Sequence, residues 1–178
     1  MNIKLYLVAI GICFFFNAHS QTFFVQKSAF GVEGGYVMAE FTEEFPDDPK
    51  DRSTQGFYGG INAQFYIEDR SFIKADVLLS FVQDSFWLHI PVLYKHYITN
   101  QVSLLAGPQL SVIVGQKTPY NSFGIDFGAG AAFDITDNIY LQAKYNFELT
   151  NTRLQMAAID IGSRHNTIFA GIGYRFLD

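Results

Sequence analysis

The feature that most constrains this chain is a two-residue alternation over residues 123–135. Every odd position there is apolar, and every even position is Gly, Ala or Asp. A period of two puts all the apolar side chains on one face of a β-strand. The run is much longer than a usual strand of ~5–6 residues, and a tilted strand needs only ~9–11 residues to cross a bilayer. The pattern therefore predicts a membrane-spanning strand with one lipid-facing side.

The same alternation recurs along the chain and divides it into eight segments. They cover residues 29–41, 55–67, 71–81, 86–98, 102–114, 123–135, 139–150 and 164–176. Every second connection, at residues 68–70, 99–101 and 136–138, is a short turn with Asp or Asn, and longer connections lie between them. Short periplasmic turns and longer external loops are typical of outer-membrane barrels. The sequence predicts an all-β fold, an eight-stranded antiparallel up-and-down transmembrane β-barrel.

The two faces of these segments differ sharply in polarity. We expect one face to contact lipid, with Phe57, Gly59, Ile61, Ala63, Phe65 and Ile67 on one strand, Ile73, Ala75, Val77, Leu79 and Phe81 on the next, and Ile139, Leu141, Ala143, Tyr145, Phe147 and Leu149 on the seventh. We expect the other face to form a polar interior network of Glu33, Lys74, Asp76, Lys95, Asp126, Asp134, Lys144, Glu148 and Arg175, together with Asn62, Gln64, Gln109, Gln142 and Asn146. Eight strands enclose a space that side chains fill, so paired charges are favoured over a conducting pore.

Aromatic residues make up 17% of the chain and gather near the expected strand ends. We expect an outer girdle of Phe41, Phe57, Phe81, Phe86, Trp87, Phe123 and Phe147, and a periplasmic girdle of Tyr66, Phe72, Tyr97, Phe133, Tyr140, Tyr174 and Phe176. Aromatic rings favour the headgroup level of a membrane. The alternative is a soluble β-sandwich or lipocalin-like barrel, whose aromatic residues would point into a core.

The first twenty residues read as a secretory signal peptide, and residues 21–178 as the barrel domain. Lys4 precedes an apolar run that ends before the small-x-small site Ala18-His19-Ser20. The only cysteine, Cys13, lies inside that run. A lipoprotein signal would need a small residue where Ile12 stands, so the mature chain is expected to carry neither a lipid anchor nor a disulfide.

Charge excludes one class of partner. Without Lys4, the mature chain has 11 basic and 17 acidic residues, a net charge of −6. No basic patch is available to neutralise nucleic-acid phosphates. The acidic residues between positions 42 and 54 lack the fixed spacing of a calcium loop, and a solvated loop is favoured over divalent bridging to lipopolysaccharide. No glycine loop suits a phosphate group, and no cofactor is expected.

Several segments resemble the PorT-like outer-membrane β-barrel proteins of the Bacteroidetes. They are Gly31-Val32-Glu33-Gly34-Gly35, Leu88-His89-Ile90-Pro91-Val92-Leu93-Tyr94-Lys95, Ala106-Gly107-Pro108, Asp126-Phe127-Gly128-Ala129-Gly130, Thr150-Asn151 and Gly171-Ile172-Gly173-Tyr174-Arg175-Phe176. The resemblance implies an eight-stranded barrel in the cell outer membrane but no single activity. It also implies that Tyr174 and Phe176 form a C-terminal signal for the barrel-assembly machinery. His89 departs from the family pattern, where an acidic residue is common, and Leu177-Asp178 follow the terminal aromatic residue.

The residue types include one candidate hydrolase triad and three histidines that are candidate metal ligands. Ser163, His165 and Glu148 are expected near the outer rim and contain the groups of a hydrolase triad. Because Glu148 and His165 share the inward parity, a lipid substrate would approach from the wrong side. His89, His96 and His165 have no metal-ligand spacing, so no metal site is expected.

The sequence thus predicts a small non-enzymatic outer-membrane barrel that presents extracellular loops. Its surroundings would be outer-membrane lipid and lipopolysaccharide, with the barrel-assembly machinery as a partner during biogenesis. The alternative is a component of a secretion or envelope assembly, with an envelope protein partner, and the third hypothesis is an outer-membrane lipid hydrolase. Rim loops are where function concentrates on a rigid wall, but the loop sequences alone do not separate these roles.

Overall fold

A computed structural model describes residues 28–43, 50–82, 85–114, 123–150, 152–156 and 159–176, with side chains described except at 41–43, 50–52, 152–156 and 159–165. The strands are β1 (Ser28–Glu43), β2 (Lys50–Glu68), β3 (Ser71–Val82), β4 (Ser85–Tyr97), β5 (Val102–Val114), β6 (Phe123–Asp134), β7 (Ile139–Glu148), β8 (Thr152–Met156) and β9 (Ile159–Phe176). The expected signal peptide, residues 1–20, lies outside the described residues. The described part of the chain contains no helix that is long and apolar enough to span a membrane.

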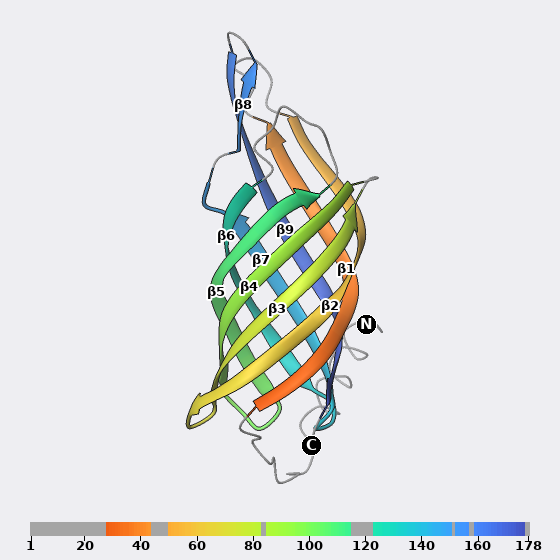
Figure 1. The fold of residues 1–178 in the computed structure, drawn as a ribbon, viewed down its shortest axis with the longest axis vertical. Helices are drawn as coiled ribbons and strands as arrows, with labels where there is room; N and C mark the ends of the chain where they lie inside the picture. Colours follow the sequence, from red (N-terminus) through yellow and green to blue (C-terminus); the bar gives the residue numbers. More distant parts are fainter. Residues whose placement is uncertain are drawn as a thin grey trace, which may run out of the picture.

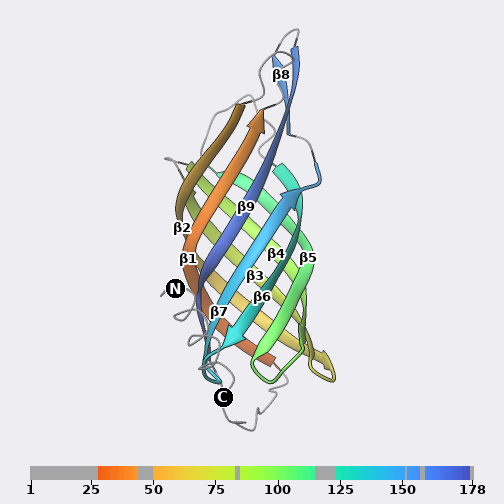
Figure 2. The ribbon, with the colours of Figure 1, turned by 180° about the vertical axis from the view of Figure 1, so that it is seen from behind.

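The strands close into an antiparallel barrel (Figures 1 and 2). Each of β1 to β7 pairs with its neighbours in sequence, β7 pairs with β9, and β9 pairs with β1 to close the wall. The remaining strand, β8, pairs only with the part of β9 that extends beyond the wall. The wall therefore has eight strands, and the predicted fold is confirmed.

The register around the wall sets the tilt of the strands. A line of paired residues that starts at Ser28 in β1 and passes through every strand of the wall returns to β1 at Met38, ten residues further along. Strand number and this offset together determine tilt and diameter. Residues far apart in sequence are thereby brought to the same height inside the barrel.

The two ends of the barrel differ in their connections. The short connections after β2, β4 and β6 lie at one end, which we call the turn end, and the opposite end is the loop end (Figure 1). In two of the turns the bonding groups are threonines rather than the expected Asp or Asn. The Thr99 hydroxyl accepts from the N–H groups of Gln101 and Val102, and Thr136 does the same for Asn138 and Ile139.

The loop end contains the main departure from the predicted strands. We expected residues 42–54 and 151–163 to be loops, but β1 and β2 stay paired out to Glu43 and Lys50, and β8 forms a hairpin with β9. These extensions lie beyond the strands that form the wall, as Figure 2 shows for β8. A strand outside the membrane needs no apolar face, so period-two alternation was no guide there.

The expected face assignment holds in the wall, with one correction for aromatic residues. Large apolar residues such as Phe57, Leu79 and Leu141 are exposed on the outside. Four residues assigned to the girdles are instead buried inside, and that assignment was wrong for them: Phe72, Trp87, Tyr97 and Tyr140. Each has the inward parity of its strand, so the alternation outweighs the preference of an aromatic ring for a strand end.

Candidate functional site

The barrel interior holds most of the polar side chains of the wall. The structure buries every residue of the expected inward set, namely Glu33, Asn62, Gln64, Lys74, Asp76, Lys95, Gln109, Asp126, Asp134, Gln142, Lys144, Asn146, Glu148 and Arg175. Burial of so many polar groups is stable only where they bond to one another. Most of their contacts fall into three sets at successive heights along the barrel, and Asn146 bonds separately to Thr167 at 3.1 Å.

The central cluster consists of Glu33, Lys74, Asp76 and Lys144. The Lys74 ammonium lies 2.5 Å from Glu33 Oε2 and 2.8 Å from Asp76 Oδ1. The Lys144 ammonium lies 3.3 Å from Asp76 Oδ2 and 3.8 Å from Glu33 Oε1. Two cations share two carboxylates, so the cluster has no net charge, and it joins β1, β3 and β7 across the inside of the barrel.

Tyr140 extends this cluster toward the turn end. Its hydroxyl donates to Glu33 Oε2 at 2.8 Å and accepts from Asn62 Nδ2 at 3.0 Å. Its ring occupies the space above Gly173, where a Cβ atom would come within 2.1 Å of the ring. Because glycine has no side chain, the Tyr140 ring can approach the backbone of Gly173 closely, and any other residue would collide with the ring.

The turn-end set is built around Asp134. This carboxylate pairs with the Arg175 guanidinium and accepts from the Tyr97 hydroxyl at 2.6 Å. The guanidinium carbon of Arg175 lies 4.6 Å from the centre of the Tyr140 ring. Lys95 is at the same end, where its ammonium donates to Gln64 Oε1 at 3.3 Å.

The loop-end cluster consists of Ser80, His89, Gln109, Ser111 and Asp126. His89 Nε2 lies 2.9 Å from Ser80 Oγ, and His89 Nδ1 lies 3.0 Å from Ser111 Oγ. Ser111 donates to Asp126, to which Gln109 also donates at 3.0 Å. Gln109 Nε2 also lies 3.3 Å from His89 Nδ1. A protonated Nδ1 would donate to Ser111 while Nε2 accepts from Ser80, whereas an unprotonated Nδ1 would accept from Gln109.

Sequence reasoning missed the loop-end cluster as a unit. Ser80 and Ser111 share the inward parity of their strands, but the expected inward set contained only charged and amide side chains. The cluster contains the hydroxyl, imidazole and acid groups used in nucleophilic catalysis, although Ser111 lies between His89 and Asp126. However, the His89 ring is buried against Trp87 and Phe169, with ring centres at 6.2 and 5.1 Å. We therefore interpret it as structural packing.

The expected hydrolase set is only partly described. Glu148 is buried and pairs with Asp126 in the register of β6 and β7. The side chains of Ser163 and His165 lie outside the described residues, and their backbones pair with Glu43 and Phe41 of β1. Among the described residues, no group of three or more His, Cys, Asp or Glu side chains could hold a metal ion.

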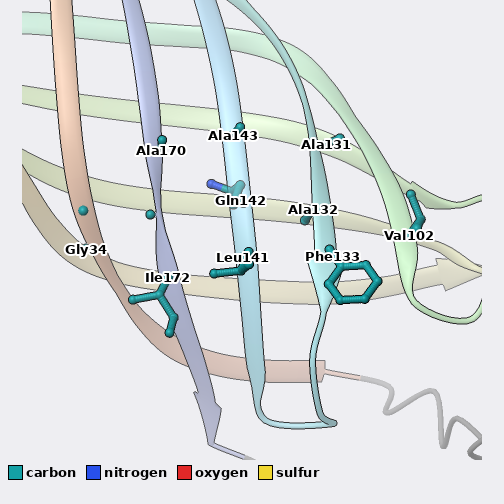
Figure 3. Close-up of a pocket in the computed structure, with 12 residues that line it drawn as sticks. Gly34, Val102, Ala131, Ala132, Phe133, Leu141, Gln142, Ala143, Ala170 and Ile172 are labelled. Atoms are coloured by element: carbon teal, nitrogen blue, oxygen red, sulfur yellow. The ribbon is translucent and has the colours of Figure 1, made fainter. Parts of the chain in front are cut away.

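The outer wall is apolar, and a shallow hollow lies on the part formed by β6, β7 and β9. Three alanines on neighbouring strands, Ala131, Ala143 and Ala170, form its floor, with Leu141 and Ile172 beside them (Figure 3). Its volume is about 580 Å³. Exposed apolar residues surround it on all strands of the wall. Such a surface is favourable against the hydrocarbon of a membrane and unfavourable in water.

The last wall strand places Tyr174 and Phe176 on this outer surface. Both rings are exposed and pack edge to face with their centres 5.4 Å apart. They lie at the turn end, since Tyr174 pairs with Ile139, the first residue of β7 after the last short turn.

Comparisons with known proteins agree with this architecture. Neither a protein family model nor a curated protein matches the chain. Among solved structures, the chain is similar to Ail, the attachment invasion locus protein of Yersinia pestis, with 18% identity and a TM-score of 0.52 over 85% of this chain and 100% of that one. Neisserial surface protein A gives 18% identity and a TM-score of 0.50 over the same shares, 85% and 100%.

A third similar structure is the outer membrane protein AlkL, with 9% identity and a TM-score of 0.50 over 90% of this chain and 95% of that one. The chain is a small outer-membrane β-barrel. Its closed sheet and apolar outer wall are the features that a membrane-spanning sheet requires. The comparisons do not show the narrower PorT-like family.

Proposed function

We propose that the protein is a non-enzymatic barrel that presents ordered hairpins outside the cell. The observation that carries this proposal is the unequal length of its strands. β1, β2 and β9 have 16, 19 and 18 residues, whereas β3 to β7 have 10 to 13. At the loop end, β1 pairs with β2 out to Glu43 and Lys50 and with β9 out to Ser163, and β8 adds to the same edge.

A paired extension of this kind differs from an unstructured loop. Its strands continue directly from the wall, so the membrane-embedded part fixes their position. Binding to such a surface costs less ordering entropy than binding to a disordered segment. Function at this end is further supported by the filled interior, which leaves ligand recognition to the surface outside the membrane.

The orientation is tested with an epitope tag. We expect a tag placed between Met156 and Ile159 to bind antibody on intact cells. A tag beside Asn138, in a short turn, should bind only after the outer membrane is permeabilised. Labelling of the Asn138 tag on intact cells would reverse the orientation and remove the proposal.

The presenting role is tested by shortening the hairpin. Replacing residues 151–161 with a short Gly-Ser turn should remove cell adhesion or ligand uptake while leaving the barrel assembled, as judged by its heat-modifiable gel mobility. Shortening residues 115–122, which connect β5 and β6, is the matched control and should leave both properties unchanged. Equal loss in both variants would contradict a specific role for the hairpin.

A PorT-like component of a secretion or envelope assembly is the second candidate. Support comes from the residues shared with that family, above all Ile90-Pro91 followed by Leu93 and Lys95, and then Ala106-Gly107-Pro108 one strand later. This role predicts an envelope protein partner that co-purifies in gentle detergent. Purification of a monomer alone from the native membrane would argue against it.

The proposed surroundings are lipid, lipopolysaccharide and, during biogenesis, the barrel-assembly machinery. Tyr174 and Phe176 are the proposed assembly signal, and their exposure on the last strand leaves them accessible before the wall closes. F176A should slow membrane assembly in cells more than F147A, a matched aromatic change on the same outer surface. Equal rates would reduce both rings to girdle residues.

Two activities, ion conduction and lipid hydrolysis, are absent from this proposal and can be tested directly. Planar bilayers containing the purified barrel should show no reproducible conductance steps, because the three polar sets and the apolar residues Val37, Tyr58, Leu78 and Phe169 are buried inside the barrel, across any path through it. For lipid hydrolysis, lipid A from cells that express the wild type or H165A should give identical mass spectra. A wild-type-specific product would restore the hydrolase hypothesis.

A further inference from the structure

Lys95 is enclosed in surroundings that suit a cation. It lies two residues before the end of β4 and is 1% exposed. Its ammonium lies 4.6 Å from the centre of the Tyr97 ring and 5.7 Å from that of Tyr140, and it donates one hydrogen bond, to Gln64 Oε1. Aromatic faces and an amide oxygen all stabilise the charged form of a lysine.

The carboxylates at this height do not balance the cations. Glu33 and Asp76 are shared by Lys74 and Lys144, and Asp134 pairs with Arg175. Lys95 has no ion pair among the residues that the structure describes. Four cations and three carboxylates therefore leave one uncompensated positive charge in the turn-end and central parts of the interior.

The carboxylates of the loop end are too far along the barrel to supply this balance. Asp126 lies three residues from the loop end of β6 and is bonded to Ser111 and Gln109. Glu148 is the last residue of β7 at that same end. An isolated buried charge is costly, and a structure retains it only with a counter-charge.

Hydrogen-bond donors near Lys95 also lack acceptors. Gln64 gives its Oε1 to Lys95, and its buried Nε2 has no hydrogen-bond partner. Arg175 Nε and Ser103 Oγ are likewise buried without a partner. Arg175 shares the Tyr140 ring with Lys95, and Ser103 pairs with Tyr97 in the register of β4 and β5. Two unpartnered acceptors, Asn62 Oδ1 and Gln142 Oε1, belong to residues bonded to the Tyr140 hydroxyl and to Glu33. Around Lys95 itself, unpartnered donors coincide with excess positive charge.

We propose that Lys95 Nζ and Gln64 Nε2 hold a halide-sized monovalent anion inside the turn end of the barrel. The anion supplies the acceptor that both donors need and the single negative charge that the four cations lack. A cation would find no free carboxylate there, and a divalent anion would overshoot the balance. Because the site is buried, the anion binds as the barrel closes. This inference does not rest on the presenting function of the hairpins.

The first experiment measures unfolding in different anions. The full mature barrel is refolded and unfolded by urea in detergent, in potassium chloride, bromide or gluconate at equal ionic strength, with gluconate as the anion too large for the site. Chloride and bromide should lower the unfolding constant of the wild type by the factor one plus the ratio of anion concentration to dissociation constant, which is about 100-fold at 100 times the dissociation constant. K95M should lose this dependence, and S80A, at the other end of the interior, should keep it.

The second experiment needs no variant. Crystals of the wild-type barrel grown in bromide should show an anomalous peak within hydrogen-bond distance of Lys95 Nζ and Gln64 Nε2, about 3.3 Å for a halide. Wild-type unfolding that is the same in chloride and gluconate would overturn the proposal. An equal anion dependence in K95M, or a bromide map without a peak at Lys95, would also overturn it. Either result would indicate that Lys95 is buried in its neutral form.

Discussion

The central cluster and the loop-end cluster hold the interior together in different ways. In the central cluster, Glu33 of β1 bonds to Lys74 of β3 and Tyr140 of β7, so it connects strands that are not neighbours in the wall. In the loop-end cluster, Ser80, His89, Ser111 and Asp126 lie on β3, β4, β5 and β6 in turn, and each bonds to the next strand. One cluster spans the inside of the barrel, and the other follows the wall.

The two clusters also differ in the groups that form their bonds. Contacts across the barrel use full charges, whereas contacts along the wall use hydroxyl, imidazole and amide groups with one carboxylate. Backbone pairing already holds neighbouring strands together, so the loop-end bonds add to contacts that exist without them. Removing a charge from the central cluster leaves its partners buried and unbalanced, which is the more costly change.

The largest effect is expected for E33Q. The substitution removes the charge that Lys74 and Lys144 share, and it should lower the free energy of unfolding by about 3–5 kcal/mol. Urea unfolding in phospholipid vesicles, followed by the fluorescence of Trp87, the single tryptophan, measures the loss. E40Q on the exposed face of the same strand is the control and should change stability by no more than about 0.5 kcal/mol.

A smaller effect is expected for G173A, which tests how tightly the central and turn-end sets pack. The new Cβ would meet the Tyr140 ring at 2.1 Å, and overpacking of this kind costs about 1–3 kcal/mol. The matched control is G59A, because its Cβ would point outward with its nearest neighbour at 3.8 Å. If the two alanine variants unfold at the same urea concentration, the interior at Tyr140 is looser than the structure indicates.

The smallest effect is expected for S80A. It removes one neutral hydrogen bond to His89 Nε2, worth about 0.5–1.5 kcal/mol, while β3 and β4 remain paired. S53A, an exposed serine on β2, controls for the loss of a hydroxyl. If S80A is as destabilising as E33Q, the inferred difference between the two clusters is wrong, because the loop-end bonds would then contribute more than a reinforcement of strands that are already paired.

The expected strands and faces were largely right because their cause is local. Alternation in residues 55–67 or 123–135 reports on which side of one strand faces hydrocarbon, and no distant residue changes that. Reading strands from alternation failed outside the membrane, where no lipid imposes an apolar face. Residues 152–156 lie outside the wall, and their alternation of Leu154 and Met156 with Arg153 and Gln155 spans only five residues, too few to mark a strand, so β8 was not predicted. Tyr140 and Trp87 were assigned to girdles by residue type although parity placed them inside.

The sequence by itself determined a closed membrane barrel and which side chains enter it, since lipid imposes a period of two on every strand. It could not determine which of those side chains meet. Glu33 and Tyr140 are 107 positions apart in the chain and touch only because the wall closes with an offset of ten residues. That offset is a property of all eight strand pairings together. The balance of charges inside, and the single cation left at Lys95, were therefore decided by the tertiary structure.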